Sequence, residues 1–212
     1  MNDLTKAIKI TKQCFKILDK ILEPGITEKQ VADLMKNKAL QLGAKKLSFT
    51  PIVSFGINAK AIHPKPTNKK LKENQFAIID FGVVVGNKKT DVTRTFCINP
   101  DIKKLKLIKL IQNAKKLAEN EIKSGVPCSK VDIIVRNYLK KHTKYKFPYA
   151  LGHGVGKRIH QKPKISPKSK DVFKVGDIFT LEPGLHGSFG GIRIEDMYLL
   201  TKKGIKNLNK DI

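Results

Sequence analysis

Residues 71–80 read LKENQFAIID, and residues 173–182 read FKVGDIFTLE. In both stretches a lysine stands eight residues before the final acid, and the residues just before that acid predict a short β-strand. A second acid follows each stretch beyond a glycine-containing turn, so each stretch begins a predicted β-hairpin with two carboxylates. The two pairs are Asp80 with Asp91, and Glu182 with Glu195. Because an odd separation across a hairpin places two side chains on one face, we expect each pair to be cross-strand neighbours.

A duplication extends outward from these hairpins. Gly25-Ile26-Thr27 leads into one predicted amphipathic helix and, one hundred residues later, Gly125-Val126-Pro127 leads into another. A further helix precedes each of them, and the clearer one runs from Ile102 to Ile122. A histidine segment precedes each hairpin, at residues 62–66 and 159–163. The predicted apolar faces are Val31, Leu34, Met35, Ala39 and Leu42; Val131, Ile134, Val135, Tyr138 and Leu139; and Ile102, Leu105, Ile108, Ile111, Ala118 and Ile122, interrupted by Lys115.

The period of this duplication decides the predicted fold class. A repeat of about 100 residues is too long for a solenoid. Two such halves favour one α+β domain, with sheets toward the centre and helices outside. A pseudo-twofold axis then brings both acidic hairpins to one place. We therefore expect residues 1–212 to form one domain, with half-repeats at about 1–100 and 101–212.

The carboxylates of the hairpins predict a metal centre. Apolar residues surround these acids, so they require strong compensation to stay ionised. His153 lies between glycines at residues 152–156, where the backbone can approach closely. Four carboxylates and one imidazole match two divalent ions bridged by a solvent oxygen, which together hydrolyse an amide. Such ligands favour Mn²⁺ or Fe²⁺, with Co²⁺ or Zn²⁺ as alternatives. The repeated His63 and His160 are candidates to hydrogen-bond the substrate and the oxyanion.

Each motif also has a purely structural alternative. Taken alone, Asp91 is explained better by an ion pair with Arg94, and His153 by packing in the core. The glycines at residues 152–156 fit neither a dinucleotide-binding nor a P-loop pattern. The metal hypothesis is favoured because the five positions recur in duplicated contexts, which independent salt bridges would not require.

The charge of the chain is strongly positive. Forty-three Lys and Arg residues against 18 Asp and Glu residues give +25. This charge suits either a solubilising lysine surface, which we favour, or association with polyanions such as RNA or the ribosome. Only four residues are arginine, and three of them (Arg94, Arg158 and Arg193) lie within three residues of a motif residue. Arginine is hard to replace where a planar fork meets a carboxylate.

The remaining composition bears on compartment and partners. No apolar run approaches the roughly 20 residues needed to cross a bilayer, and the N-terminus lacks the apolar centre of a signal peptide. Three widely spaced cysteines, Cys14, Cys97 and Cys128, are expected to be buried, reduced thiols. We therefore expect a cytoplasmic protein without a membrane partner.

Five motifs in order resemble the metallopeptidase family with the pita-bread fold, which includes methionine aminopeptidases, aminopeptidase P and prolidase. They are Ile79-Asp80-Phe81-Gly82, Asp91-Val92-Thr93-Arg94-Thr95-Phe96, Gly152-His153-Gly154-Val155-Gly156, Thr180-Leu181-Glu182-Pro183-Gly184 and Gly191-Ile192-Arg193-Ile194-Glu195-Asp196. The resemblance implies a curved antiparallel sheet covered by helices and a dinuclear metal site. The implied ligands are Asp80, Asp91, His153, Glu182 and Glu195. It also implies that Glu182 shuttles a proton, that His63 and His160 line the substrate site, and that Arg193 supports the ligands or binds a substrate carboxylate.

The motif contexts are similar to the proline-directed branch of this family. We therefore expect an exopeptidase that acts on Xaa-Pro peptides. Two alternatives stay open: a methionine aminopeptidase that removes initiator Met, and a non-catalytic RNA- or ribosome-binding protein on the same fold. Relative to prolidases, we expect the N-terminal domain to be absent, and Pro64 follows His63 where a small residue is common. A monomer or weak dimer is expected.

Overall fold

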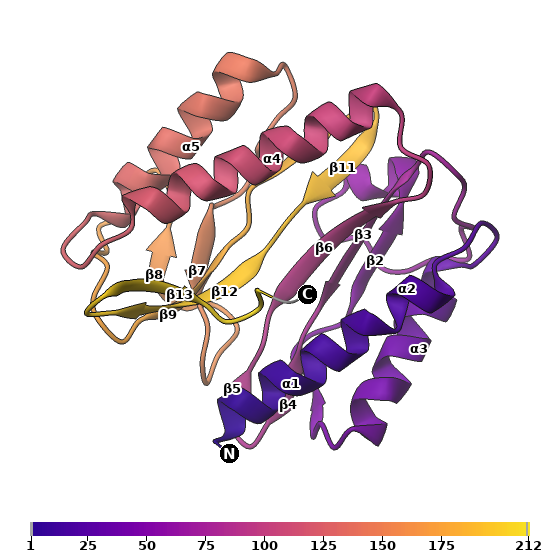
Figure 1. Cartoon of the computed structure of the whole chain (residues 1–212), viewed down its shortest axis with the longest axis horizontal. Coiled ribbons are helices and arrows are strands. Elements are labelled where there is room, and N and C mark those ends of the chain that lie inside the picture. The colour runs from indigo at the N-terminus through magenta and orange to yellow at the C-terminus, as the bar shows by residue number, and fades with distance from the viewer. Residues whose placement is uncertain (1, 211) are drawn as a thin grey trace.

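The computed structural model of this protein describes residues 2–210 and residue 212. Its two halves each consist of helices that cover strands, with the first half in indigo to magenta and the second running from pink-red through orange to yellow (Figure 1). The α+β class predicted from the duplication is confirmed. The helices are α1 (Asp3–Lys16), α2 (Leu18–Ile21), α3 (Glu28–Gln41), α4 (Ile102–Glu121) and α5 (Cys128–His142), with a 3₁₀ helix, η1, at Gly56–Lys60.

The strands of each half form antiparallel sheets. In the first half, β2, β3 and β6 form one sheet and β1, β4 and β5 another. In the second half, five strands lie in the order β13-β12-β9-β7-β8, and β10 pairs with β11. The bounds are β1 Lys46–Leu47, β2 Ile52–Phe55, β3 Phe76–Phe81, β4 Val83–Val85, β5 Lys88–Lys89, β6 Val92–Cys97, β7 Gly152–Gly154, β8 Gln161–Ile165, β9 Ile178–Leu181, β10 Gly184–Gly187, β11 Gly190–Arg193, β12 Asp196–Thr201 and β13 Gly204–Asn207.

The two halves meet at their acidic strands. An isolated antiparallel bridge joins Thr93 of β6 to Glu195, just before β12. In the first half Asp80 lies opposite Thr93, so Asp91 is displaced by two residues along the same face. The expected direct opposition of Asp80 and Asp91 is therefore wrong, because the turn places Asp91 just before the paired part of β6.

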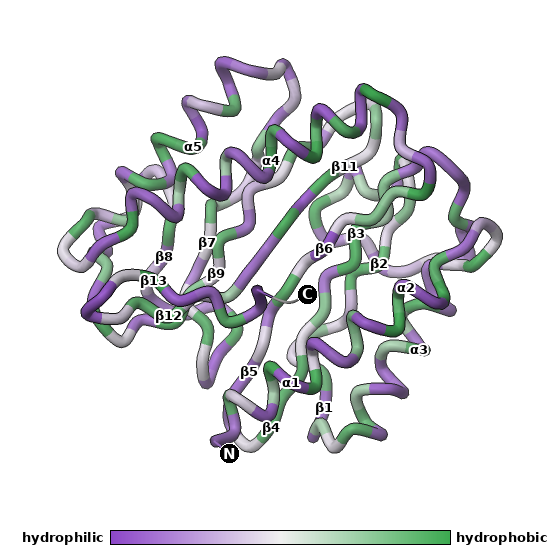
Figure 2. The backbone as a smooth tube through the Cα atoms, viewed as in Figure 1, coloured by the Kyte–Doolittle hydropathy of each residue, from purple (hydrophilic) through white to green (hydrophobic). Residues whose placement is uncertain are grey.

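Local sequence signals explain where several helices begin. The Asn2 side chain accepts a hydrogen bond from the Thr5 N–H and caps α1. Thr27 and Gln30 form the reciprocal capping box that starts α3. Each half has its own apolar core, and Figure 2 shows hydrophilic and hydrophobic segments alternating along the covering helices. The helix periodicity predicted from the sequence is thus confirmed.

Three residues on the predicted apolar faces are nevertheless exposed. Ile102 is 71% exposed, Leu105 is 50% exposed, and Leu34 is 43% exposed. The buried residues of α4 are Ile111, Ala114 and Ala118, which come later in the helix. Spacing predicts which face of a helix is apolar, but the first turns of α4 lie outside the cores.

Two of the three cysteines are buried, as expected. Cys14 and Cys128 are buried thiols, whereas Cys97 is only half-buried, and all three are free. Among the helices of the described chain, none combines the length and apolar character that crossing a lipid bilayer requires.

Candidate metal centre and substrate pocket

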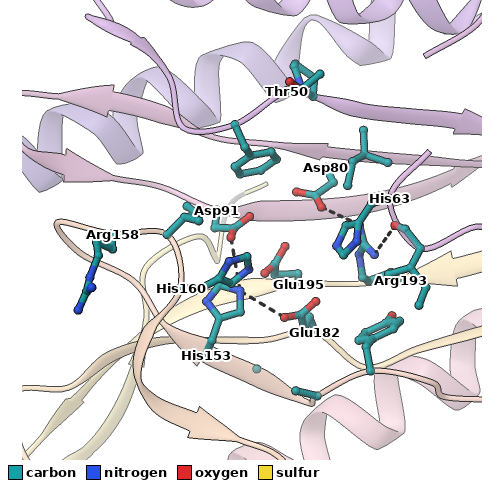
Figure 3. Close-up of a pocket in the computed structure, with 18 of the residues that line it drawn as sticks. Thr50, His63, Asp80, Asp91, His153, Arg158, His160, Glu182, Arg193 and Glu195 are labelled. Atoms are coloured by element: carbon teal, nitrogen blue, oxygen red, sulfur yellow. Dashed lines mark hydrogen bonds and ion pairs between the residues drawn. The ribbon is translucent and has the colours of Figure 1, made fainter. Parts of the chain in front are cut away.

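A pocket of about 870 Å³ opens between the two halves of the molecule. Its lining includes all eight residues that the sequence predicts for the metal and substrate sites, and these residues come from elements far apart in the chain (Figure 3). The five predicted ligands lie together near its centre in Figure 3. The eight are His63, Asp80, Asp91, His153, His160, Glu182, Arg193 and Glu195.

Strand ends position the acids. Asp80 is the penultimate residue of β3, and Glu182 follows the last residue of β9. Asp91 and Glu195 each stand directly before a returning strand, β6 and β12. Each half thus contributes one acid from the end of its first hairpin strand and one from the start of its second. The Thr93–Glu195 bridge holds the two hairpins side by side.

Three of the five predicted ligands are already close enough to share an ion. Donor atoms of Asp91, His153 and Glu195 all lie within 4.8 Å of one another. Donors bound to one ion at about 2.2 Å can lie at most about 4.4 Å apart, so only small side-chain movements would bring the three onto a single ion. His153 Nε2 also lies 3.5 Å from Glu182 Oε1 and 3.6 Å from Asp91 Oδ2.

Asp80 completes the donor set with a free oxygen. Its Oδ2 accepts a hydrogen bond of 2.6 Å from Arg193, whereas its buried Oδ1 has no hydrogen-bond partner in the described part of the chain. A buried carboxylate oxygen without a donor is costly unless a cation or water meets it. The donor set therefore fits divalent cations.

The electrostatics of the metal-free site support the same interpretation. Burial, reinforced by the charge of Asp80, raises the pKa of Glu182 to about 8. Burial and the neighbouring carboxylates also raise the pKa values of Asp91 and Glu195 well above their ordinary range. Without cations these acids therefore bind protons more tightly than exposed carboxyl groups do, and divalent ions would displace those protons.

His153 is set to act as a neutral ligand. Burial, together with His160, lowers its pKa to about 4. Its Nδ1 lies 3.2 Å from the carbonyl oxygen of Gly154, so Nδ1 carries the proton and Nε2 faces the carboxylates. Side chains at Gly152 or Gly154 would collide with the carbonyl oxygens of Thr180 or Lys162. The glycines on both sides of His153 are therefore required by close backbone packing.

A hydrogen-bonded chain connects the acids of the two halves. Arg193 donates to Asp80 through Nη2 and to Thr93 Oγ1 through Nε, at 2.6 and 3.2 Å. The Thr93 hydroxyl in turn donates to Glu195 Oε2 at 2.8 Å. Asp80, Arg193, Thr93 and Glu195 are each 7% exposed or less, so this chain orders the acids from behind.

The two predicted substrate histidines lie on opposite sides of the acids. The ring of His160 contacts that of His153 edge-on, with centroids 4.3 Å apart. His63 follows η1 and lies beside Arg193 and Asp80 in Figure 3. Burial and the charge of Arg193 lower the pKa of His63, which favours its neutral form.

Of the other two arginines near a motif, Arg94 meets a carboxylate as expected, whereas Arg158 does not. Arg94 pairs with Asp196 at 2.5 Å, so the alternative in which Asp91 serves only as the partner of Arg94 is wrong. Arg158 lines the pocket, but its guanidinium makes no ion pair with any described acid. In Figure 3 it points away from the carboxylates.

Tyr149 is a pocket residue that no sequence motif indicated. This residue lines the pocket, and its ring lies 5.7 Å from the guanidinium carbon of Arg193. Its buried hydroxyl has no hydrogen-bond partner among residues 2–210 and 212. The one feature of the sequence that could have indicated Tyr149 is its position four residues before His153, in the segment that leads into β7.

Comparisons with known proteins agree with this geometry. A family model described as metallopeptidase family M24 matches residues 2–202. An uncharacterized peptidase of Staphylococcus saprophyticus is 34% identical over 209 residues, which cover 97% of this chain and 59% of the relative.

Solved structures also resemble the chain over nearly its whole length. The prolidase from Pyrococcus furiosus superimposes with a TM-score of 0.94 at 30% identity, covering 99% of this chain and 63% of that one. The Xaa-Pro dipeptidase from Bacillus anthracis superimposes with a TM-score of 0.93 at 28% identity, covering 99% and 60%. The chain spans about three fifths of the length of these relatives. It belongs to metallopeptidase family M24.

Proposed function

We propose that this chain is a dinuclear metal-dependent exopeptidase that hydrolyses the N-terminal bond of Xaa-Pro peptides. The observation that carries this proposal is the convergence of Asp80, Asp91, His153, Glu182 and Glu195 on one pocket, with donor atoms of three of them within 4.8 Å. We assign these five residues as ligands of two divalent cations, with Mn²⁺ or Fe²⁺ preferred by the mostly carboxylate donors.

Bound cations would supply an activated water and polarise the scissile carbonyl. The remaining roles fall to side chains of this chain. Glu182 takes the proton from the attacking water and passes it to the leaving nitrogen. His63 and His160, on either side of the acids, hydrogen-bond the substrate and the oxyanion that develops during attack. Arg193 keeps Asp80 oriented through the 2.6 Å contact.

The preference for proline rests on two supports. The names of the solved relatives from Pyrococcus furiosus and Bacillus anthracis, a prolidase and an Xaa-Pro dipeptidase, indicate that specificity for those proteins. In this chain part of the pocket lining is apolar and suits a pyrrolidine ring, which has no N–H to satisfy once it is acylated. The apolar lining residues include Phe49, Pro51, Ile52, Ile62 and Pro64.

A side-by-side assay tests this function. The chain loaded with Mn²⁺ or with Co²⁺ is offered Ala-Pro, Ala-Pro-Ala and Met-Ala-Ser, with metal-free protein and Glu182→Ala as controls. We expect cleavage of the proline peptides, and loss of that cleavage in both controls. Cleavage of Met-Ala-Ser alone would replace the proposal with a methionine aminopeptidase. Activity that survives Glu182→Ala would refute the assigned mechanism.

A further inference from the structure

A second hollow, of about 450 Å³, adjoins the substrate pocket. The two share three lining residues, Arg158, Gln161 and Lys162, so the second hollow lies directly beside the first. The cations that line the second hollow are Lys88, Lys157, Arg158 and Lys162, and its acid is Asp177.

These cations are largely free to meet a ligand. Lys88, Lys157 and Arg158 form no ion pair with the acids that the structure describes. Lys162 lies 3.4 Å from Asp171, but its side chain is 89% exposed, so that contact is weak. The Arg158 guanidinium is directed away from the carboxylates of the metal centre (Figure 3).

The single acid of the hollow is already engaged. The Asp177 carboxylate accepts a hydrogen bond from the Lys174 N–H at 2.8 Å. One acid against four cations leaves the hollow positive. The wall of the main pocket adds Lys65 and Lys164 to this field. A hollow with this charge attracts anionic groups, more strongly at low ionic strength.

We propose that this basic hollow is a subsite for acidic residues downstream of the scissile bond. The inference rests on the proposed function. An enzyme that removes the N-terminal residue leaves only the C-terminal side of its substrate free to extend beyond the pocket. Each extended residue spans about 3.3 Å. Glutamates that follow Xaa-Pro therefore extend along Arg158 toward Lys88 and Lys157, and the substrate class is Xaa-Pro peptides with an acidic continuation.

Charge-matched peptides test this subsite. Mn²⁺-loaded protein is offered Ala-Pro-Glu-Glu, Ala-Pro-Gly-Gly and Ala-Pro-Lys-Lys in 20 mM and in 300 mM salt. We expect kcat/KM at low salt to be about tenfold higher for the Glu-Glu peptide than for the Lys-Lys peptide, with the ratio falling toward one at high salt. Equal rates for the two charged peptides at low salt would overturn the proposal.

A matched pair of charge reversals separates the hollow from the general positive surface. Lys88→Glu with Lys157→Glu changes two residues that line only the second hollow. Lys103→Glu with Lys109→Glu makes the same change in net charge on α4, outside both hollows. We expect the first pair to abolish the preference for Glu-Glu and the second to retain it. An equal loss in both variants would show that the preference comes from net charge alone, which overturns the subsite.

A binding measurement distinguishes failure of the subsite from failure of the proposed function. Ala-Pro-Glu-Glu with a C-terminal fluorophore is titrated with metal-free protein and followed by anisotropy. We expect Kd to rise about tenfold in the Lys88→Glu, Lys157→Glu variant and to change less than twofold in the α4 control. This result without peptide cleavage would refute the exopeptidase assignment and keep the subsite. An unchanged Kd in both variants would refute the subsite.

Discussion

The guanidinium of Arg193 lies 2.6 Å from Oδ2 of Asp80, and the two residues come from different halves of the duplicated fold. Arg193 is 1% exposed and Asp80 is 7% exposed, so little water screens the pair. The contact holds one carboxylate oxygen and leaves the other, Oδ1, without a partner in the described chain. An ion pair between the halves thus prepares one ligand of the proposed metal centre.

Breaking this pair is expected to destabilise the metal-free chain. Arg193→Met leaves the Asp80 carboxylate buried without its cation, which costs about 3 kcal/mol of the free energy of unfolding. Arg193→Lys keeps the charge but loses the planar fork that also reaches Thr93, so we expect a smaller loss. Urea denaturation of the three proteins measures both values. A loss below about 1 kcal/mol for Arg193→Met would contradict the role of the pair.

Metal removal is expected to lower the melting temperature, and the difference should depend on pH. A cation at one hundred times its Kd adds about 3 kcal/mol, which is about 5–10 °C for a chain of this size. The folded, metal-free state raises the pKa of Glu182 to about 8 from an ordinary value of 4.5, so it binds the proton more tightly than the unfolded state. That stabilisation is complete below about pH 4.5 and is lost as the pH rises through about 8.

Metal binding has the opposite dependence, because the carboxylates must lose those protons to bind cations. We therefore expect the gap between the melting temperatures of Mn²⁺-loaded and metal-free protein to widen from pH 5.5 to pH 8. Differential scanning fluorimetry of both forms across this range measures the gap. A gap that stays constant or narrows would show that these acids do not gain protons when the cations leave.

Ligand and substrate roles are expected to separate in two variants. Asp91→Asn removes one donor of the cluster within 4.8 Å, so at most about one Mn²⁺ should remain per chain after dialysis. His160→Ala removes a ring that contacts His153 from the pocket side, so metal content should be retained while kcat falls about 100- to 1000-fold. Elemental analysis and Ala-Pro hydrolysis measure the two quantities. Metal loss in His160→Ala would assign that histidine to the metal centre instead.

The duplication made the positions of the acids predictable. An acid at the end of an apolar strand is costly, and its recurrence in a second, similar context indicates a shared site. The role of Lys115 could not be predicted in this way. This lysine interrupts the predicted apolar face of α4. Its ammonium pairs with Asp196 and donates to the Tyr198 hydroxyl of β12. Local periodicity carries no information about a partner 81 residues away.

The exposed apolar residues of α4 also show that local periodicity carries no information about distant packing. The spacing of Ile102 and Leu105 correctly predicts a helix, but both are at least half exposed. A hydrophobic pattern defines a face and not the extent of the core beneath it. Tyr149 was missed because an aromatic residue in a loop has no periodic context that assigns it to a pocket.

A further buried acid fixes the segment that carries His63. Glu28, fully buried at the start of α3, accepts hydrogen bonds at both ends of that segment. Its Oε1 accepts from the Phe55 N–H at 2.7 Å, and its Oε2 accepts from the Thr67 N–H at 2.8 Å and the Thr67 hydroxyl at 2.6 Å. The Asn58 side chain also donates to both oxygens. Glu28 therefore holds together two points of the backbone that lie on either side of His63.

Glu28→Gln tests whether this arrangement positions His63. Every partner of Glu28 donates a hydrogen, so the glutamine amide group must face donors and leave buried N–H groups unsatisfied, at about 2 kcal/mol. We also expect kcat/KM for Ala-Pro to fall about tenfold, because His63 loses its fixed placement. Val31→Ala, in the core of the same helix, is the control, since it destabilises α3 without removing a hydrogen bond to that segment. Similar kcat/KM values for the two variants, measured well below their melting temperatures, would show that Glu28 acts on stability alone.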